Sequence, residues 1–279
     1  MTLLRAILAF IGIVAVSLVL VPLQALALMV GWTAVSNTLP QVWNRSVLWM
    51  MGIRVHKHGA LGEMRPLLLV ANHVSWVDIM VLSAAEKVSF IAKREVGSWP
   101  FIGLLAKLNG TVFVNRERRQ STGDAAKEIA DRLGSGRVMV LFGEGTSSNG
   151  IHVLPFRTAL VGGAVRAMGK GGEAAVQPVA INYTQLHGVP IGRFHKPRVA
   201  WYGDMEMAGH LWWILKYGDF DVDVAFGEPI RLSDGVDRKA VAKRAEEVVR
   251  NLVGEATAGR LTRGAPLPAA SAQKPEVAA

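Results

Sequence analysis

The fold is decided by one stretch of the chain, Ala71-Asn72-His73-Val74-Ser75-Trp76-Val77-Asp78. It follows an apolar run over 67–70 that is typical of a buried strand, and apolar residues of an expected helix come after it. His73 is therefore expected where a strand ends, at the edge of an α/β sheet, which is where ligands usually bind.

A histidine and a carboxylate in this arrangement predict a base and its orienting partner. Asp78 would hold one ring nitrogen of His73 as N–H, so that the other nitrogen could take a proton from a hydroxyl. A structural interpretation is also open, because Ser75-x-x-Asp78 matches a helix capping box with Asp in place of Glu or Gln. In that case His73 would be an ordinary loop histidine. The motif alone leaves both interpretations standing.

Composition limits the possible functions of the chain. Its 279 residues are enough for one large domain or two small ones, and its formal net charge of +9 indicates an anionic partner, either nucleic acid or an anionic membrane surface. The chain has no cysteine, which excludes disulfides, thiolate nucleophiles and cysteine-ligated zinc. His56 and His58 lack a third metal ligand nearby in the sequence and are expected to be surface residues.

The N-terminal part of the chain predicts association with a membrane. No charged residue occurs over 6–44, and about 20 apolar residues suffice to cross a bilayer core. We expect a transmembrane helix kinked at Pro22 or a hairpin in one leaflet, with a buried core helix as the alternative. Tryptophans beside cationic residues over 41–57 are typical of a membrane interface or of an ordinary amphipathic helix. The larger cationic cluster follows the apolar run, which favours a cytoplasmic position for the rest of the chain.

The remainder of the chain alternates between expected strands and helices. This alternation predicts an α/β domain with a mostly parallel sheet flanked by helices. The predicted organisation is an N-terminal membrane-embedded or interfacial helical segment over 1–62, the α/β domain over 63–258 and a disordered tail over 259–279. The expected strands are 67–70, 88–92, 111–114, 138–142, 176–183, 199–202 and 221–226, and the expected helices are 99–108, 122–133, 158–168 and 238–253.

Four short motifs occur in order along this domain and resemble those of the bacterial 1-acylglycerol-3-phosphate acyltransferases and related lysolipid acyltransferases. The resemblance covers about residues 64–230. The motifs are Asn72-His73-x4-Asp78, Phe113-Val114-Asn115-Arg116, Glu144-Gly145-Thr146 and Gln177-Pro178-Val179-Ala180.

The resemblance implies a mechanism and a set of site residues. His73 would be the general base, oriented by Asp78, and would activate a lysolipid hydroxyl for attack on an acyl thioester without a covalent acyl-enzyme. The co-substrate would be a thioester of acyl-carrier protein or coenzyme A, with no other cofactor and no metal. Arg116 would bind an anionic headgroup. The remaining implied substrate-binding residues are Phe113, Lys93, Glu144, Gly145, Thr146, Arg157 and Pro178.

One departure from the family pattern bears on the acceptor. The third motif commonly reads Glu-Gly-Thr-Arg-Ser, whereas Ser147 follows Thr146 here. The lost arginine is a bidentate donor suited to phosphate, so the change suggests an acceptor without a phosphomonoester, although Arg116, Arg118, Arg119 and Arg157 remain. This stretch and residues 201–205 look similar to the lyso-ornithine lipid O-acyltransferase branch. Lyso-ornithine lipid is therefore the expected acceptor, and lysophosphatidate is the alternative.

Two other classes of protein are alternatives to an enzyme. A membrane-anchored nucleic-acid-binding protein would need a basic stripe interleaved with exposed aromatics. Here the arginines cluster at strand ends and the tryptophans lie near the apolar segment, so no nucleic-acid partner is expected. The other class is a non-catalytic membrane scaffold that kept the fold.

Overall fold

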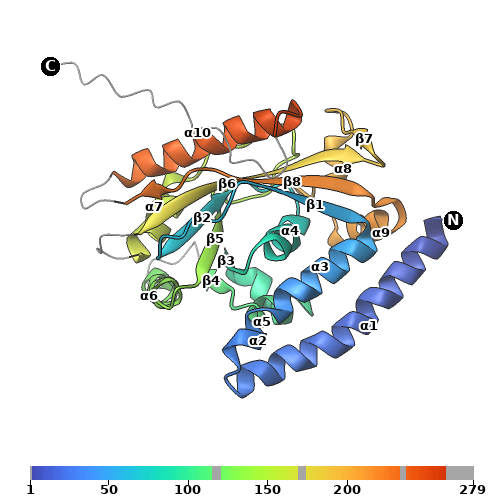
Figure 1. Ribbon diagram of the computed structural model, residues 1–279, viewed down its shortest axis with the longest axis horizontal. Coiled ribbons are helices and arrows are strands. Elements are labelled where there is room, and N and C mark those ends of the chain that lie inside the picture. Colours follow the sequence, from blue (N-terminus) through green and yellow to red (C-terminus); the bar gives the residue numbers. More distant parts are fainter. Residues whose placement is uncertain (1, 115–120, 169–173, 233–236, 262–279) are drawn as a thin grey trace.

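A single mixed sheet forms the centre of the protein. The computed structural model describes residues 2–114, 121–168, 174–232 and 237–261. Within these ranges the main path of the sheet runs β1-β8-β6-β2-β5-β3-β4, and β7 and β9 pair with β6 (Figure 1). The strands are β1 (Ile53–His58), β2 (Leu67–Ala71), β3 (Val88–Lys93), β4 (Val112–Val114), β5 (Val138–Phe142), β6 (Ala175–Leu186), β7 (Val189–Pro190), β8 (Phe220–Phe226) and β9 (Ile230–Arg231).

The directions of the strands bring the loops that carry the predicted site residues to one edge of the sheet. β6, β2, β5, β3 and β4 run parallel to one another, so the residues that follow β2, β3, β4 and β5 share an edge. β8 runs antiparallel to β6, and β1 runs parallel to β8. Ala71 pairs with Val179, so the second half of β6 extends beyond the end of β2. This extension brings β6 alongside the loop that carries His73.

Helices cover both faces of the sheet, as expected for buried parallel strands whose sequence is continuously apolar. Figure 1 shows α7 (Thr158–Ala167) and α10 (Arg238–Thr257) on one face and α1, α3 and α4 on the other. All five residues of β2 are buried between these two layers. The bounds of the other helices, including α1, α3 and α4, are α1 (Thr2–Met29), α2 (Thr33–Ser36), α3 (Leu39–Met51), α4 (Val77–Ala85), the 3-10 helix η1 (Arg94–Ser98), α5 (Ile102–Leu108), α6 (Ser121–Gly134), α8 (Lys196–Val199) and α9 (Met207–Tyr217).

The apolar N-terminal segment folds as one continuous helix, α1, which contains Pro22. In the described part of the chain it is the one helix long and apolar enough to cross a membrane. The core-helix interpretation is wrong, because only 17% of its most apolar window is buried. Small residues, among them Ala6 and Ala9, pack inward, and large ones such as Leu18 stay exposed. α1 lies beside α3 (Figure 1).

Three expectations about secondary structure were wrong. The predicted strand over 199–202 is absent from the described chain: α8 ends at Val199, and the N–H of Trp201 donates to the Val74 carbonyl, outside any ladder. The helix expected from 99 begins only at Ile102, because Phe101 has a φ of 61°, which interrupts a right-handed helix. Residues 53–58, expected within a helical N-terminal segment, form strand β1.

Candidate active site

His73 and Asp78 are in contact at the predicted edge of the sheet. His73 Nδ1 lies 2.9 Å from Asp78 Oδ2. β2 ends two residues before His73, and Asp78 occupies the first turn of α4, so the short turn between them folds the carboxylate back onto the ring. Asp78 is fully buried, whereas the His73 side chain remains 17% exposed. Among the described residues Nε2 has no hydrogen-bond partner, which leaves this nitrogen able to accept a proton.

Backbone groups hold the Asp78 carboxylate in place. Oδ2 accepts hydrogen bonds from the N–H of Val74 at 2.6 Å and of Ser75 at 2.9 Å, besides its contact with His73. The Ser75 bond is the half of the predicted capping box in which the carboxylate accepts from a backbone N–H. The same oxygen contacts His73, and the role of Asp78 in orienting a catalytic base stays a prediction. Oδ1 accepts from the hydroxyl of Tyr183, a residue that the sequence did not single out.

The ring of Phe142 fixes the plane of the imidazole. The rings of His73 and Phe142 stack with centroids 3.9 Å apart and an interplanar angle of 16°. Phe142 is the last residue of β5, the strand beside β2, so the parallel pairing brings it under His73. An apolar run that ends in Phe gives no sign of this contact, and sequence reasoning missed it.

Glu144 links the third motif to the first. Its Oε1 accepts from the backbone N–H of His73 at 2.8 Å, and its Oε2 accepts from the N–H of Leu154 at 3.1 Å. The residue is buried, and this burial raises the pKa of the Glu144 carboxyl to about 7. Gly145 follows with a φ of 71°, a conformation in which glycine carries no steric cost. The Glu144 carboxylate therefore ties two loops together, while its predicted role in placing the acceptor stays a prediction.

Comparison with known proteins shows the family to which this chain belongs. The family model described as acyltransferase matches residues 52–182. The lyso-ornithine lipid O-acyltransferase of Brucella abortus is 49% identical over 92% of this chain and 96% of its own length. The chain belongs to the acyltransferase family. This confirms the resemblance derived from the four motifs.

Two further comparisons, at lower sequence identity, concern other acyltransferases. A 1-acyl-sn-glycerol-3-phosphate acyltransferase of Neisseria gonorrhoeae is 33% identical over 68% of this chain and 70% of its own length. The crystal structure of the 1-acyl-sn-glycerophosphate (LPA) acyltransferase from Thermotoga maritima matches with a TM-score of 0.63 at 22% identity. That match covers 91% of this chain and 97% of the other, and it confirms the predicted fold class.

The other predicted site residues of the acyltransferase lie at or near the same edge. Lys93 is exposed at the end of β3, and Thr146 is exposed beside Gly145. The Phe113 ring, on β4, lies against η1 at Gly97, where a Cβ would stand 3.3 Å from it. Their roles in binding substrate stay predictions. Arg116, Arg118 and Arg119 lie outside the described residues.

Two predicted residues have backbone roles in the acyltransferase. Arg157 immediately precedes α7 with its side chain exposed, and its N–H donates to the Gly143 carbonyl at 2.8 Å. Pro178 is buried in β6 beside Val70 of β2, and its carbonyl accepts from the N–H of Gly227 at 2.9 Å. Pro178 thus lies in the sheet beneath the edge, one residue before the partner of Ala71.

A second polar cluster lies on β1 and β8. His56 Nε2 is 2.6 Å from Asp221 Oδ1, and His58 Nε2 is 2.8 Å from Asp223 Oδ1. The expectation that both histidines are surface residues was wrong for His58, which is 2% exposed, because the tail of α10 covers this end of the sheet. The described residues contain no group of three or more histidines and carboxylates that could hold a metal ion.

Proposed function

We propose that this acyltransferase transfers a fatty acyl group from an acyl thioester to the hydroxyl of lyso-ornithine lipid, giving ornithine lipid. The proposal is carried by the His73–Asp78 pair at 2.9 Å. The similarity to the Brucella abortus enzyme, which extends over almost the whole of both chains, supports the choice of acceptor. So does Ser147 at the position where lysophosphatidate acyltransferases commonly carry arginine.

The proposed chemistry follows from the two ring nitrogens of His73. Asp78 accepts from Nδ1–H, so Nε2 is the nitrogen that takes the proton of the acceptor hydroxyl. As that proton leaves, the hydroxyl oxygen bonds to the thioester carbonyl carbon. The carbon–sulfur bond then breaks, and the departing thiolate receives the proton from His73. The Asp78 carboxylate stabilises the imidazolium between these two steps.

The alternative acceptor is 1-acylglycerol-3-phosphate, which would give phosphatidic acid. One observation favours it: the Neisseria gonorrhoeae enzyme is 33% identical to this chain over 189 residues. A phosphomonoester needs cationic donors, and the exposed Arg157 at the start of α7 is available as one.

The donor and the site of action extend this proposal. We propose acyl-carrier protein as the carrier of the thioester, with coenzyme A as the alternative, and a catalytic body on the cytoplasmic face of the bacterial inner membrane. The exposed leucines of α1 support membrane attachment, because so many large apolar side chains are unfavourable in water. The 79% exposed side chain of Trp49 on α3 also supports contact with a membrane interface, where tryptophan is enriched.

The test uses purified enzyme in detergent or vesicles with labelled acyl-carrier protein or acyl-coenzyme A. Each lysolipid is supplied separately, and the product is identified by mass spectrometry. We expect acylation of lyso-ornithine lipid at the higher kcat/KM. Exclusive acylation of lysophosphatidate would overturn the proposed acceptor. Ser147→Arg is the matched variant, and it should shift preference toward lysophosphatidate, since guanidinium pairs with phosphate.

A non-catalytic scaffold or a nucleic-acid-binding protein would give a different outcome. Neither would transfer an acyl group to any lysolipid, and neither would lose its activity on His73→Ala. DNA binding that persists in that variant, without acyl transfer by the parent protein, would favour a nucleic-acid partner over an enzyme.

A further inference from the structure

A buried phenol completes the hydrogen bonding of Asp78. The Tyr183 hydroxyl donates to Asp78 Oδ1 at 2.8 Å. The other carboxylate oxygen, Oδ2, is already shared by His73 Nδ1 and two backbone N–H groups. Tyr183 is 2% exposed and Asp78 is 0% exposed, so no water replaces this bond. Tyr183 is thus the one side chain among the described residues that donates to Oδ1.

We propose that Tyr183 is a positioning residue for acyl transfer, acting on His73 through Asp78. The proposal rests on the proposed function, in which His73 is the base. A carboxylate can rotate about its Cβ–Cγ bond, and a donor on Oδ1 holds it with Oδ2 facing Nδ1. The same bond draws negative charge toward Oδ1 and away from the imidazole, which lowers the stabilisation of protonated His73.

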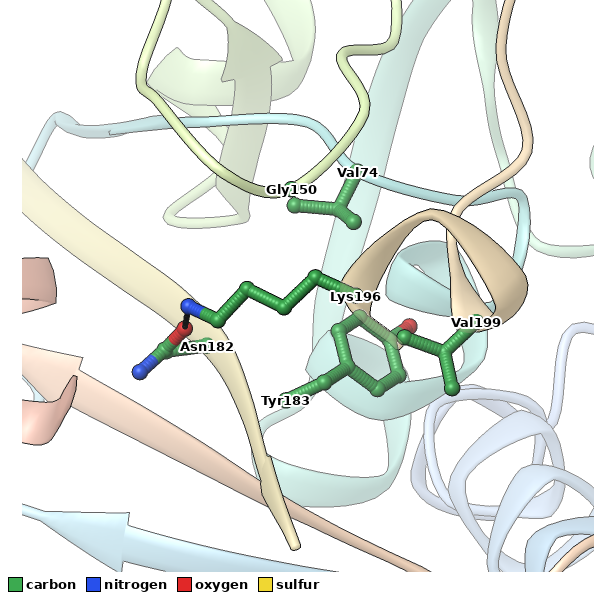
Figure 2. Close-up of a pocket in the computed structure, with 6 residues that line it drawn as sticks. All are labelled: Val74, Gly150, Asn182, Tyr183, Lys196 and Val199. Carbon is green, nitrogen blue, oxygen red and sulfur yellow. Dashed lines mark hydrogen bonds between the residues drawn. The ribbon is translucent and has the colours of Figure 1, made fainter. Parts of the chain in front are cut away.

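The fold holds Tyr183 in this place by several means. β6 extends past the end of β2, which carries the Tyr183 side chain over the His73 loop. The pairing of β6 with β8 shifts register between Tyr183 and Gln185, and such a bulge commonly aims a side chain at an active site. The Tyr183 ring packs edge-on against Phe220, with centroids 6.5 Å apart. Figure 2 shows it lying beside Val199 and Lys196.

Burial, together with the nearby Asp78 carboxylate, keeps the phenol protonated. Both raise the pKa of Tyr183 well above its usual value, so that its hydroxyl remains a donor wherever the enzyme is active. The other titratable groups around the pair are Glu144, on the backbone N–H of His73, and Lys196, whose Nζ donates to Asn182 across the strand. Of Glu144, Lys196 and Tyr183, only Tyr183 forms a hydrogen bond with Asp78 among the contacts of the described residues.

The first test is Tyr183→Phe, which removes the hydroxyl and keeps the ring. We expect kcat to fall about tenfold or more with KM unchanged, since a hydrogen bond to a buried charge is lost and no substrate contact is altered. The acid limb of the kcat/KM profile should move to higher pH, because the carboxylate then stabilises protonated His73 more strongly. Tyr217→Phe, on the exposed end of α9, is the matched control and should change neither quantity.

A double-mutant cycle shows whether Tyr183 acts through Asp78. In an Asp78→Asn background the change Tyr183→Phe should cost far less than it does alone. Independent, additive losses would overturn the proposal. The proposal would also be overturned if the folded Tyr183→Phe enzyme were less active but kept the acid limb of its kcat/KM profile at the same pH. That pattern indicates a purely structural role.

A second variant covers the case in which Tyr183→Phe does not fold. Site-specific replacement of Tyr183 by 3-fluorotyrosine keeps the hydroxyl and makes it a stronger donor. The acid limb should then move in the opposite direction, to lower pH, and an unmoved limb would contradict the inference. Failure of the proposed function looks different: the unaltered enzyme would then acylate no lysolipid at all.

Discussion

The backbone N–H of His73 donates to Oε1 of Glu144 at 2.8 Å, so the loop that carries the histidine is held by the carboxyl group of another motif. The other oxygen of Glu144 accepts from Leu154, at the far side of the loop that follows β5. Two loops that are separate in sequence are thereby joined through one buried side chain. Four experiments follow from these contacts and from the attachment of α1.

Replacing Glu144 by Gln should weaken both the fold and the activity. A carboxamide has one acceptor oxygen, so its NH2 group would face one of the two backbone N–H donors and leave it unsatisfied. We expect a loss of about 1–3 kcal/mol in the free energy of unfolding. Denaturant titration measures it, with Glu95→Gln, at an exposed position, as the control. Equal stability of the two variants would contradict the structural role given to Glu144.

The raised pKa of Glu144 predicts how stability depends on pH. The value of about 7 in the folded protein exceeds the ordinary 4.5, so the folded state holds the proton more tightly than the unfolded state. The resulting stability is fully present below pH 4.5 and is lost as pH rises through about 7. Its size is on the order of 3 kcal/mol. Unfolding measured between pH 5 and pH 8 should show this contribution, and Glu144→Gln should lack it.

Replacing His73 by Ala should remove acyl transfer while leaving the fold intact. Loss of a general base alone costs about 10²- to 10⁴-fold in rate. Asp78 would keep its donors from Val74, Ser75 and Tyr183, so the carboxylate would not be left unpaired. Activity assays and circular dichroism check the two halves of the prediction. His152→Ala changes an exposed histidine in the loop after β5 and should be fully active.

Arg5 fastens the start of α1 to the catalytic body. Its guanidinium donates to the carbonyls of Leu215 at 2.6 Å and Met51 at 2.7 Å, at the ends of α9 and α3. Hydrogen bonds from a charged group contribute about 1.5–3 kcal/mol, so Arg5→Ala should lower the thermal midpoint. Membrane attachment should persist, because the apolar face of α1 is unchanged. Lys107→Ala, at an exposed position on α5, is the comparison.

The parts of the site that sequence predicts are those encoded locally. An apolar run followed by a polar turn places His73 at a strand end, and a spacing of five residues brings Asp78 back to it. Strand directions follow from the alternation of elements, and they bring Glu144 to the same edge.

The parts that sequence does not reveal depend on long-range packing. Tyr183 and Asp78 are 105 positions apart in the sequence. Their contact requires β6 to extend beyond the end of β2 and to contain a β-bulge. Phe142 lies under the imidazole only because β5 neighbours β2. The apolar residues near 199–202 have strand propensity, but β6 and β8 already pair with each other, and Trp201 binds the Val74 carbonyl instead. Which strands become neighbours depends on the whole sheet, and the strand propensity of individual residues does not predict it.

The reach of β6 also restricts which insertions and deletions the enzyme can tolerate. Side chains alternate along a strand, so a slip of one residue would turn the phenol away and could present the carboxamide of Asn182 to the Asp78 carboxylate. The same slip would break the two bonds that Asn72 makes with the backbone of Ile181. Length changes in this strand should therefore inactivate the enzyme, whereas the tip at His187 and Gly188 has room to vary in length.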